Sequence, residues 1–172
     1  TAALESAAEK SLVRDAVIAS SSEQAKRLWR MREDLPDAQK AAGGSIAHDV
    51  SVPLSRLAEF IARADAEMEK AYPAVRPCCF GHLGDGNMHY NPLCPADWTY
   101  ERFAAETENI NGIVHDIVSS VGGSISAEHG IGRLRLEENL RYKDPIEMDL
   151  MVRMKRALDP LNIMNPGRVV PR

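Results

Sequence analysis

The chain is 172 residues long, carries a formal net charge of −4, and is 44% hydrophobic but only 5% aromatic. This length suits one domain with a mainly aliphatic core, and the interspersed charges argue against a nucleic-acid partner, which needs a basic patch. No apolar run approaches the length of a membrane span, and no signal peptide opens the sequence. The three cysteines are an odd number and two of them are neighbours, so we expect a reducing, cytoplasmic location.

Apolar residues at helical spacing predict four helices. They cover residues 23–35, a stretch between Ser51 and Tyr72, residues 103–121, and residues 146–158. The first is expected to stop at Pro36 and the third at the glycine pair that follows it. The last is expected to end at Asp159, because the residue before a proline is pushed out of the helical region.

Five strands are predicted between these helices: residues 13–19, residues 45–52, the two arms of a hairpin around residues 78–90, and residues 124–127. From Ser45 onward the order is strand, helix, hairpin, helix, strand, which is the split βαβ pattern of a ferredoxin-like sheet. The predicted fold class is therefore α+β, with an antiparallel sheet and helices packed on one face.

The most informative segment is 81–89, which reads GHLGDGNMH. Asp85-Gly86 is a two-residue hairpin turn signal flanked by apolar runs. Counting outward from that turn predicts that His82 stands opposite His89. Directly opposed residues have Cβ atoms about 4.5–5.5 Å apart on one face of the sheet. The pattern predicts two imidazoles that share one metal ion, with a simple hydrogen-bonded pair of histidines as the alternative.

A third ligand is predicted at Glu128, in the segment 123–130, which reads GSISAEHG. Two histidines and one carboxylate leave an open coordination position, which is how catalytic zinc is usually held. The sequence therefore predicts a divalent metal, zinc by this donor set, on His82, His89 and Glu128.

Three motifs in one order resemble a known family: GHLGDGNMH at 81–89, GSISAEHGIG at 123–132 and DPLNIMNPG at 159–167. The chain is similar to the C-terminal domain of FAD-linked oxidases of the vanillyl-alcohol oxidase superfamily. The most similar subgroup contains the D-2-hydroxyglutarate and D-lactate dehydrogenases. The resemblance also takes in HDVSVP at 48–53 and WRMRE at 29–33, so it covers nearly the whole chain.

The resemblance implies that residues 1–172 bind substrate and metal in an enzyme that oxidises a D-2-hydroxy acid to the 2-oxo acid by hydride transfer to FAD. Family members bind FAD mainly through a separate, preceding domain. This sequence has no Gly-rich phosphate loop and starts at Thr1 without a methionine. We therefore expect a fragment of a longer flavoenzyme that is inactive alone, and we leave its electron acceptor and a homodimer open.

Three further site residues are implied by the resemblance. Arg32 matches the arginine that binds the substrate carboxylate, a task suited to a guanidinium because it can bind bidentately. Asn91, two residues after His89 and on the same strand face, matches a polar contact to substrate. Asn165 matches a C-terminal segment that folds against the flavin. The alternatives are a solvated helix charge for Arg32 and an ordinary turn residue for Asn165.

His129 is the candidate general base. A metal-coordinated hydroxyl becomes more acidic, and an imidazole with a pKa of about 6.5 suits removal of its proton at neutral pH. A fourth ligand and a structural histidine are the alternatives. In regular extended structure Glu128 and His129 would point to opposite faces, so an irregular backbone permitted by Gly130 is needed to bring them together.

Two positions depart from the family pattern. The family usually has a lysine, which helps to hold a second carboxylate, where this chain has Ala47, and a threonine contact falls on Pro36. Both losses would weaken binding of a dicarboxylate such as 2-hydroxyglutarate. Either the substrate is a monocarboxylate of D-lactate type, or the alignment with the family is shifted in the Ala-Gly loop. His48 could supply the missing positive charge when protonated. The alternative is that it makes a local hydrogen bond.

Two other functions compete with the flavoenzyme. The first is a stand-alone metal-dependent hydrolase, in which the open position holds a water nucleophile and Glu128 or His129 acts as base. The second is a domain that binds a metabolite without turnover.

Overall fold

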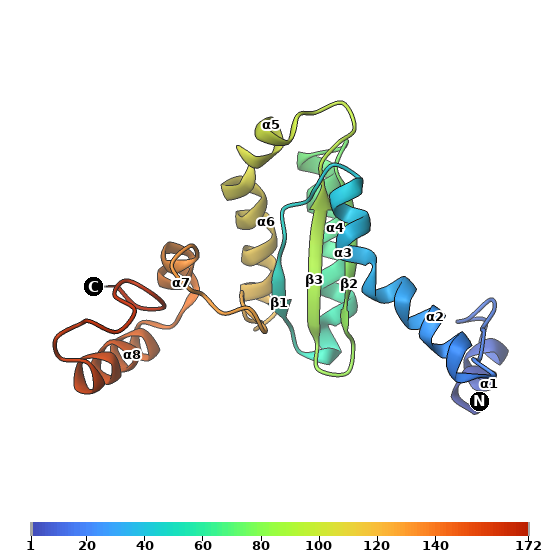
Figure 1. Ribbon diagram of the computed structural model, residues 1–172, viewed down its shortest axis with the longest axis horizontal. Helices are drawn as coiled ribbons and strands as arrows, with labels where there is room; N and C mark the ends of the chain where they lie inside the picture. The colour runs from blue at the N-terminus through green and yellow to red at the C-terminus, as the bar shows by residue number, and fades with distance from the viewer. Residues whose placement is uncertain (1, 172) are drawn as a thin grey trace. The chain divides into compact units, whose positions relative to one another are not determined.

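The structure is a computed structural model that describes residues 2–171 and consists of two compact units, one up to Ala41 and one from Ala42 onward (Figure 1). Within the described residues, no helix combines the length and apolar character needed to cross a membrane.

The first unit contains helices α1 (Ala2–Glu9), α2 (Ser22–Glu33) and α3 (Leu35–Ala41). α2 begins close to the predicted position, because the Ser21 side chain caps it by accepting a hydrogen bond from the backbone N–H of Gln24. It ends slightly before the predicted end. Pro36 then lies in the first turn of α3, where its missing N–H costs no helical hydrogen bond.

The predicted strand at residues 13–19 is wrong. The stretch is irregular, and the apolar side chains of Val17 and Ile18 are 67% and 58% exposed. A strand needs a neighbour to satisfy its backbone donors and acceptors. No strand pairs with this stretch in the part of the chain that the structure describes.

The second unit is built on a three-stranded antiparallel sheet of β1 (Asp49–Ser51), β2 (Arg76–His82) and β3 (Asn87–Leu93) in the order β1-β3-β2. The strand predicted at 45–52 is shorter than expected, with Ser45 adding only an isolated bridge to Leu93. The predicted strand at 124–127 is wrong, because it is reduced to one bridge between Ser51 and Ser124.

Helices α4 (Leu57–Ala71), which follows a 3-10 turn at Leu54–Arg56, and α6 (Thr107–Ser120), which follows α5 (Tyr100–Ala104), lie on one face of the sheet (Figure 1). The core between these layers is aliphatic with a few aromatic rings, as the composition predicts. Its most buried members include Val50, Phe60, Ala64, Met68, Tyr90, Ile110 and Val114.

Two helices follow α6. α8 (Pro145–Leu158) agrees with the prediction and is capped by the Asp144 side chain, whereas α7 (Leu136–Tyr142) was not predicted. The periodic apolar residues that predicted α8 do not form a core, since Ile146 and Leu158 are 73% and 80% exposed.

The α+β class, the antiparallel sheet and the helices on one face are confirmed, but the predicted hairpin register is wrong. Four residues, 83–86, form the loop instead of Asp85-Gly86 alone, so His82 pairs with Asn87 and His89 pairs with Phe80. Gly86 adopts a φ of +74°, and its carbonyl accepts a hydrogen bond from the N–H of Val52. This contact with the chain after β1 holds the longer loop in place.

Candidate functional site

Asp49 and His89 are register partners across the ladder between β1 and β3. Their side chains project from the same face, with Nδ1 of His89 3.9 Å from Oδ1 of Asp49. The Asp49 side chain is only 1% exposed and that of His89 is 14% exposed. The sheet therefore fixes a shielded imidazole beside a buried carboxylate.

Glu128 reaches the other nitrogen of the same imidazole. Its Oε1 lies 3.2 Å from Nε2 of His89. The side-chain amide of Asn87, on β3, donates to that same oxygen at 2.8 Å. The carboxylate of Glu128 is 44% exposed, so it stands at the edge between the sheet and solvent.

The segment that carries Glu128 bends around Asp49. The backbone N–H groups of Glu128 and His129 donate to Oδ2 of Asp49 at 2.8 and 2.7 Å, and the N–H of Ala127 donates to the Asp49 main-chain oxygen at 3.0 Å. Gly130 follows with a φ of +76°. The backbone is not extended here, so Glu128 and His129 are not forced to opposite faces.

His129 lies against His89. Their rings stack at 5.6 Å between centroids with planes 24° apart, and Nδ1 of His129 is 3.7 Å from Oδ2 of Asp49. The His129 side chain is 65% exposed, unlike that of His89. An exposed imidazole at the rim of the cluster can exchange protons with solvent or with a bound molecule.

Asp49, His89, Glu128 and His129 form a group in which one donor atom from each residue lies within 4.8 Å of all the others. These four side chains are close enough to hold one ion, and they are the one such cluster of histidine, cysteine and acidic side chains among residues 2–171. Imidazole nitrogen and carboxylate oxygen are ligands that zinc accepts.

His82 lies on the same face of the hairpin as His89 but diagonal to it, because the register is shifted by two residues. The ring centroids are 6.4 Å apart, and His82 is exposed. His82 therefore stands next to the four-residue group, and is not one of its members.

Hydrogen bonds hold Asp49 in its ionised form. Burial acts to raise the pKa of this carboxyl, but the backbone N–H groups of His129 and Glu128, with the two neighbouring imidazoles, lower it below its usual value overall. Oδ1 of Asp49 is buried and accepts no hydrogen bond, and the same holds for Oδ1 of Asn87.

The residues matched by resemblance are spread over the chain. Arg32 is on α2 in the first unit. Asn91 is buried on β3, where its Oδ1 accepts the backbone N–H of His48 at 3.1 Å. Asn165 is exposed after α8 and has a φ of +49°, which fits a turn residue.

His48 makes a local hydrogen bond rather than replacing a cation. It is 1% exposed, and its Nδ1 donates to the carbonyl of Tyr90 at 2.7 Å. Burial, with repulsion from His115 and Arg135, lowers the pKa of His48 to about 3. A guanidinium does lie nearby, since Nη2 of Arg135 donates to the carbonyl of Ala47 at 3.0 Å.

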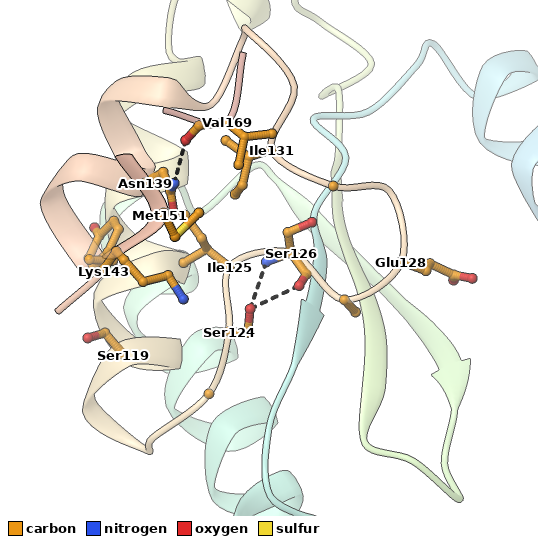
Figure 2. A pocket seen from close by; sticks show the side chains of 14 residues that line it. Ser119, Ser124, Ile125, Ser126, Glu128, Ile131, Asn139, Lys143, Met151 and Val169 are labelled. Carbon is orange, nitrogen blue, oxygen red and sulfur yellow. Dashed lines mark hydrogen bonds between the residues drawn. The ribbon is translucent and has the colours of Figure 1, made fainter. Parts of the chain in front are cut away.

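A separate pocket of about 420 Å³ lies between the 123–131 segment, α7 and α8 (Figure 2). Asn139 closes one side by donating to the carbonyl of Val169. Ser124 and Ser126 are tied to each other by hydrogen bonds. Figure 2 shows the Glu128 side chain pointing away from the other lining residues, so this pocket does not contain the donor group.

Sequence reasoning missed Asp49 and Asn87 as site residues. Asn87 lay within the quoted GHLGDGNMH motif, so its position was visible although its contact was not. Asp49 likewise lay within the quoted HDVSVP motif, but it binds residues 79 and 80 positions away, and no local pattern encodes such a contact.

The family model of FAD linked oxidases, C-terminal domain, matches residues 1–169. The chain belongs to this family. That membership agrees with the three motifs and the α+β fold.

Three relatives illustrate the similarity. D-2-hydroxyglutarate dehydrogenase of Xanthomonas citri pv. viticola is 37% identical over 98% of this chain and 35% of that protein. The namesake from Stutzerimonas stutzeri is 33% identical over 98% of the chain and 36% of that protein. D-2-hydroxyglutarate dehydrogenase, mitochondrial, of Arabidopsis thaliana is 34% identical over 95% of the chain and 28% of that protein. The chain thus spans about a third of the length of the curated relatives it matches.

Proposed function

We propose that this chain is the substrate- and metal-binding domain of a flavin-dependent dehydrogenase that oxidises a D-2-hydroxy acid to the 2-oxo acid. One observation carries the proposal: His89, Glu128 and His129 converge in a chain whose relatives are named D-2-hydroxyglutarate dehydrogenase. Separate parts of the sequence supply these side chains, and a purely structural role does not require their convergence.

The distance between two of the donor atoms supports zinc as the proposed ion. Two ligands of a tetrahedral zinc at about 2.0–2.2 Å are about 3.3–3.6 Å from each other. Nε2 of His89 and Oε1 of Glu128 are 3.2 Å apart, which is close to this separation. We propose His82, on the same face of the hairpin, as the third ligand after a change of its side-chain rotamer.

The chain's own residues then divide the work. A bound divalent ion supplies Lewis acidity, which lowers the pKa of a coordinated hydroxyl. His129 accepts the hydroxyl proton of the substrate, because it is an exposed imidazole stacked on His89. Arg32 binds the substrate carboxylate and Asn91 adds a polar contact, as the family motif implies.

FAD, when bound, supplies the electron acceptor for the two-electron oxidation. Within this chain we propose Asn165 as the residue nearest to the flavin. The remaining contacts to FAD are assigned to parts of the protein outside these residues.

The substrate class we propose is a D-2-hydroxy acid. The relatives' name favours 2-hydroxyglutarate, whereas Ala47 and Pro36 remove two groups that would hold its second carboxylate. Arg135 lies 88 residues further along the chain, but its guanidinium is hydrogen-bonded to the Ala47 carbonyl and so places a cation near this position. A direct comparison of D-2-hydroxyglutarate with D-lactate decides between these substrates.

The location stays a prediction. The cysteine count favours a cytoplasmic protein, and the relatives from Arabidopsis thaliana and Bos taurus are named mitochondrial. Both compartments are reducing enough for three free cysteines.

The test uses the full-length protein that contains this chain. We expect a yellow protein with the absorption spectrum of bound flavin, about one zinc per chain, and oxidation of a D-2-hydroxy acid with an artificial dye as acceptor. A colourless protein that hydrolyses esters or amides in a zinc-dependent reaction would instead support the metal hydrolase.

A further inference from the structure

A single buried residue, Asp49, lies against three residues of the proposed metal site, His89, Glu128 and His129. Asp49 lies on β1, opposite His89 on β3, and holds the segment 127–129 through three hydrogen bonds. These partners come from two separate stretches of the chain.

The two oxygens of Asp49 have different surroundings. Oδ2 accepts two backbone N–H groups, at 2.8 and 2.7 Å. Oδ1 accepts none, although it is buried, and Nδ1 of His89 lies 3.9 Å away. A buried carboxylate oxygen without a donor carries an energetic cost, so it needs a partner in the working state. The imidazole of His89 is the donor placed to reach it.

We infer that Asp49 is a positioning residue that orients His89 through its Nδ1–H and fixes the backbone of Glu128 and His129. This inference rests on the metal site proposed above.

The arrangement fixes the tautomer of His89. A proton on Nδ1 faces Oδ1 of Asp49, which leaves the lone pair of Nε2 toward Oε1 of Glu128, 3.2 Å away. A histidine that ligates a metal commonly donates its other N–H to a carboxylate, and this contact sets its ring orientation. Closing the 3.9 Å gap to hydrogen-bond length needs a movement of about 1 Å.

The same carboxylate explains how adjacent residues reach one site. By capturing the N–H groups of Glu128 and His129, Oδ2 replaces the ladder hydrogen bonds that an extended strand would make. The Glu128 side chain then reaches Nε2 of His89 while the His129 ring stacks on it. Asp49 touches neither substrate nor flavin in this scheme and acts through its neighbours.

The test measures zinc affinity of the full-length protein by competition with a chelator, with zinc alone as the probe. Asp49→Asn keeps the size of the side chain and removes its charge. We expect this variant to bind zinc about 10–100-fold more weakly than wild type, the usual effect of losing such a partner. It should also raise hydrogen exchange in a peptide covering residues 125–131 of the metal-free protein.

Asp159→Asn is the matched control. Asp159 is also buried and also accepts two backbone N–H groups, from Ile163 and Met164, but it lies at the end of α8. We expect this variant to lose stability without a change in zinc affinity. A purely structural role for Asp49 would give both variants the same behaviour.

The possible results distinguish failure of the proposed role of Asp49 from failure of the proposed metal site. Wild type that binds no zinc overturns the metal site. If wild type and Asp49→Asn bind zinc with equal affinity, the positioning role of Asp49 is overturned and the metal site stands. If Asp49→Asn fails to fold, hydrogen exchange of the wild-type protein still tests the inference. The backbone amides of residues 127–129 should exchange slowly before zinc is added. Their rapid exchange would overturn the inference.

Discussion

Asn87 donates a hydrogen bond of 2.8 Å to Glu128, which lies 41 residues further along the chain. Asn87 also begins β3, and its own backbone N–H donates to the side chain of Asp85 in the hairpin loop. The hairpin therefore orients a carboxylate that belongs to another segment. Besides reversing the chain, the loop therefore directs the Glu128 carboxylate toward His89.

Replacing Asn87 by alanine should weaken zinc binding. Without the amide donor, the half-exposed carboxylate of Glu128 gains rotational freedom, and we expect about a tenfold lower affinity. Chelator competition on the full-length protein measures this. The control is Asn109→Ala, since Asn109 likewise donates to a glutamate, Glu106, but on the exposed surface of α6. Equal zinc affinities in the two variants would contradict the orienting role.

Substitution of His129 by alanine separates chemistry from metal binding. A lost general base lowers turnover by about 10²–10⁴-fold, so we expect this loss while the zinc content persists. His89→Ala and His82→Ala should lose zinc and activity together. Zinc analysis and steady-state kinetics of the three full-length variants provide the measurement. If His129→Ala also strips the zinc, His129 is a ligand and the base must be sought elsewhere.

The sequence predicted α2, α4, α6, α8 and the α+β class, but it missed α3 and α7, did not separate α5 from α6, and predicted the hairpin register wrongly. Helical periodicity depends on residues three or four positions apart, so local spacing is enough to find α4, α6 and α8. The register depends on loop length, and the loop around Asp85-Gly86 has four residues rather than two. Side chains alternate with a period of two, so a two-residue shift keeps His82 and His89 on one face. The predicted shared face is therefore correct although the predicted pairing is wrong.

The sequence predicted His82, His89 and Glu128 around one ion with His129 beside them, and the structure brings His89, Glu128 and His129 together but leaves His82 outside the group. The cause of this convergence was not predicted. In a regular strand, the adjacent residues Glu128 and His129 would point to opposite faces and could not share one site. The bend that brings them together is set by the carboxylate of Asp49, 79 and 80 residues away. Long-range contacts of this kind have no local signature, which is why Asp49 was absent from the predicted site.

Gly86 should not tolerate a side chain. Its φ is +74°, and an added Cβ would lie 2.1 Å from the carbonyl oxygen of Val52. We expect Gly86→Ala to lower the free energy of unfolding by about 2 kcal/mol or more, from backbone strain together with the clash. Gly84→Ala in the same loop is the control, since no atom lies within 4 Å of its added Cβ. Urea unfolding that shows similar stabilities would contradict the observed loop.

The stability of the chain should fall in acid through His48. Burial, with repulsion from His115 and Arg135, lowers the folded-state pKa of His48 to about 3, below an unfolded value of about 6.5. Between these values only the unfolded chain binds the proton, so stability is lost as the pH falls through this window. The slope from this one group is at most about 1.4 kcal/mol per pH unit.

Urea unfolding of wild type and His48→Gln at pH 6.5, 5.5 and 4.5 measures that slope. We expect the variant to start less stable, because the carbonyl of Tyr90 loses its imidazole donor. Its stability should then fall less steeply than that of wild type. Parallel curves would mean that His48 does not titrate differently on folding.

Residues 1–172 purified alone should neither hold FAD tightly nor oxidise a hydroxy acid. The sequence contains no Gly-rich phosphate loop, and Asn165 with its neighbours offers contact to one side of a flavin ring at most. Such limited contact does not offset the entropy cost of capturing the cofactor. Titration with FAD, followed by dye-linked assays with D-lactate and D-2-hydroxyglutarate, is the measurement. Micromolar FAD binding or turnover by these residues would place the cofactor site inside this chain and overturn the proposed division of labour.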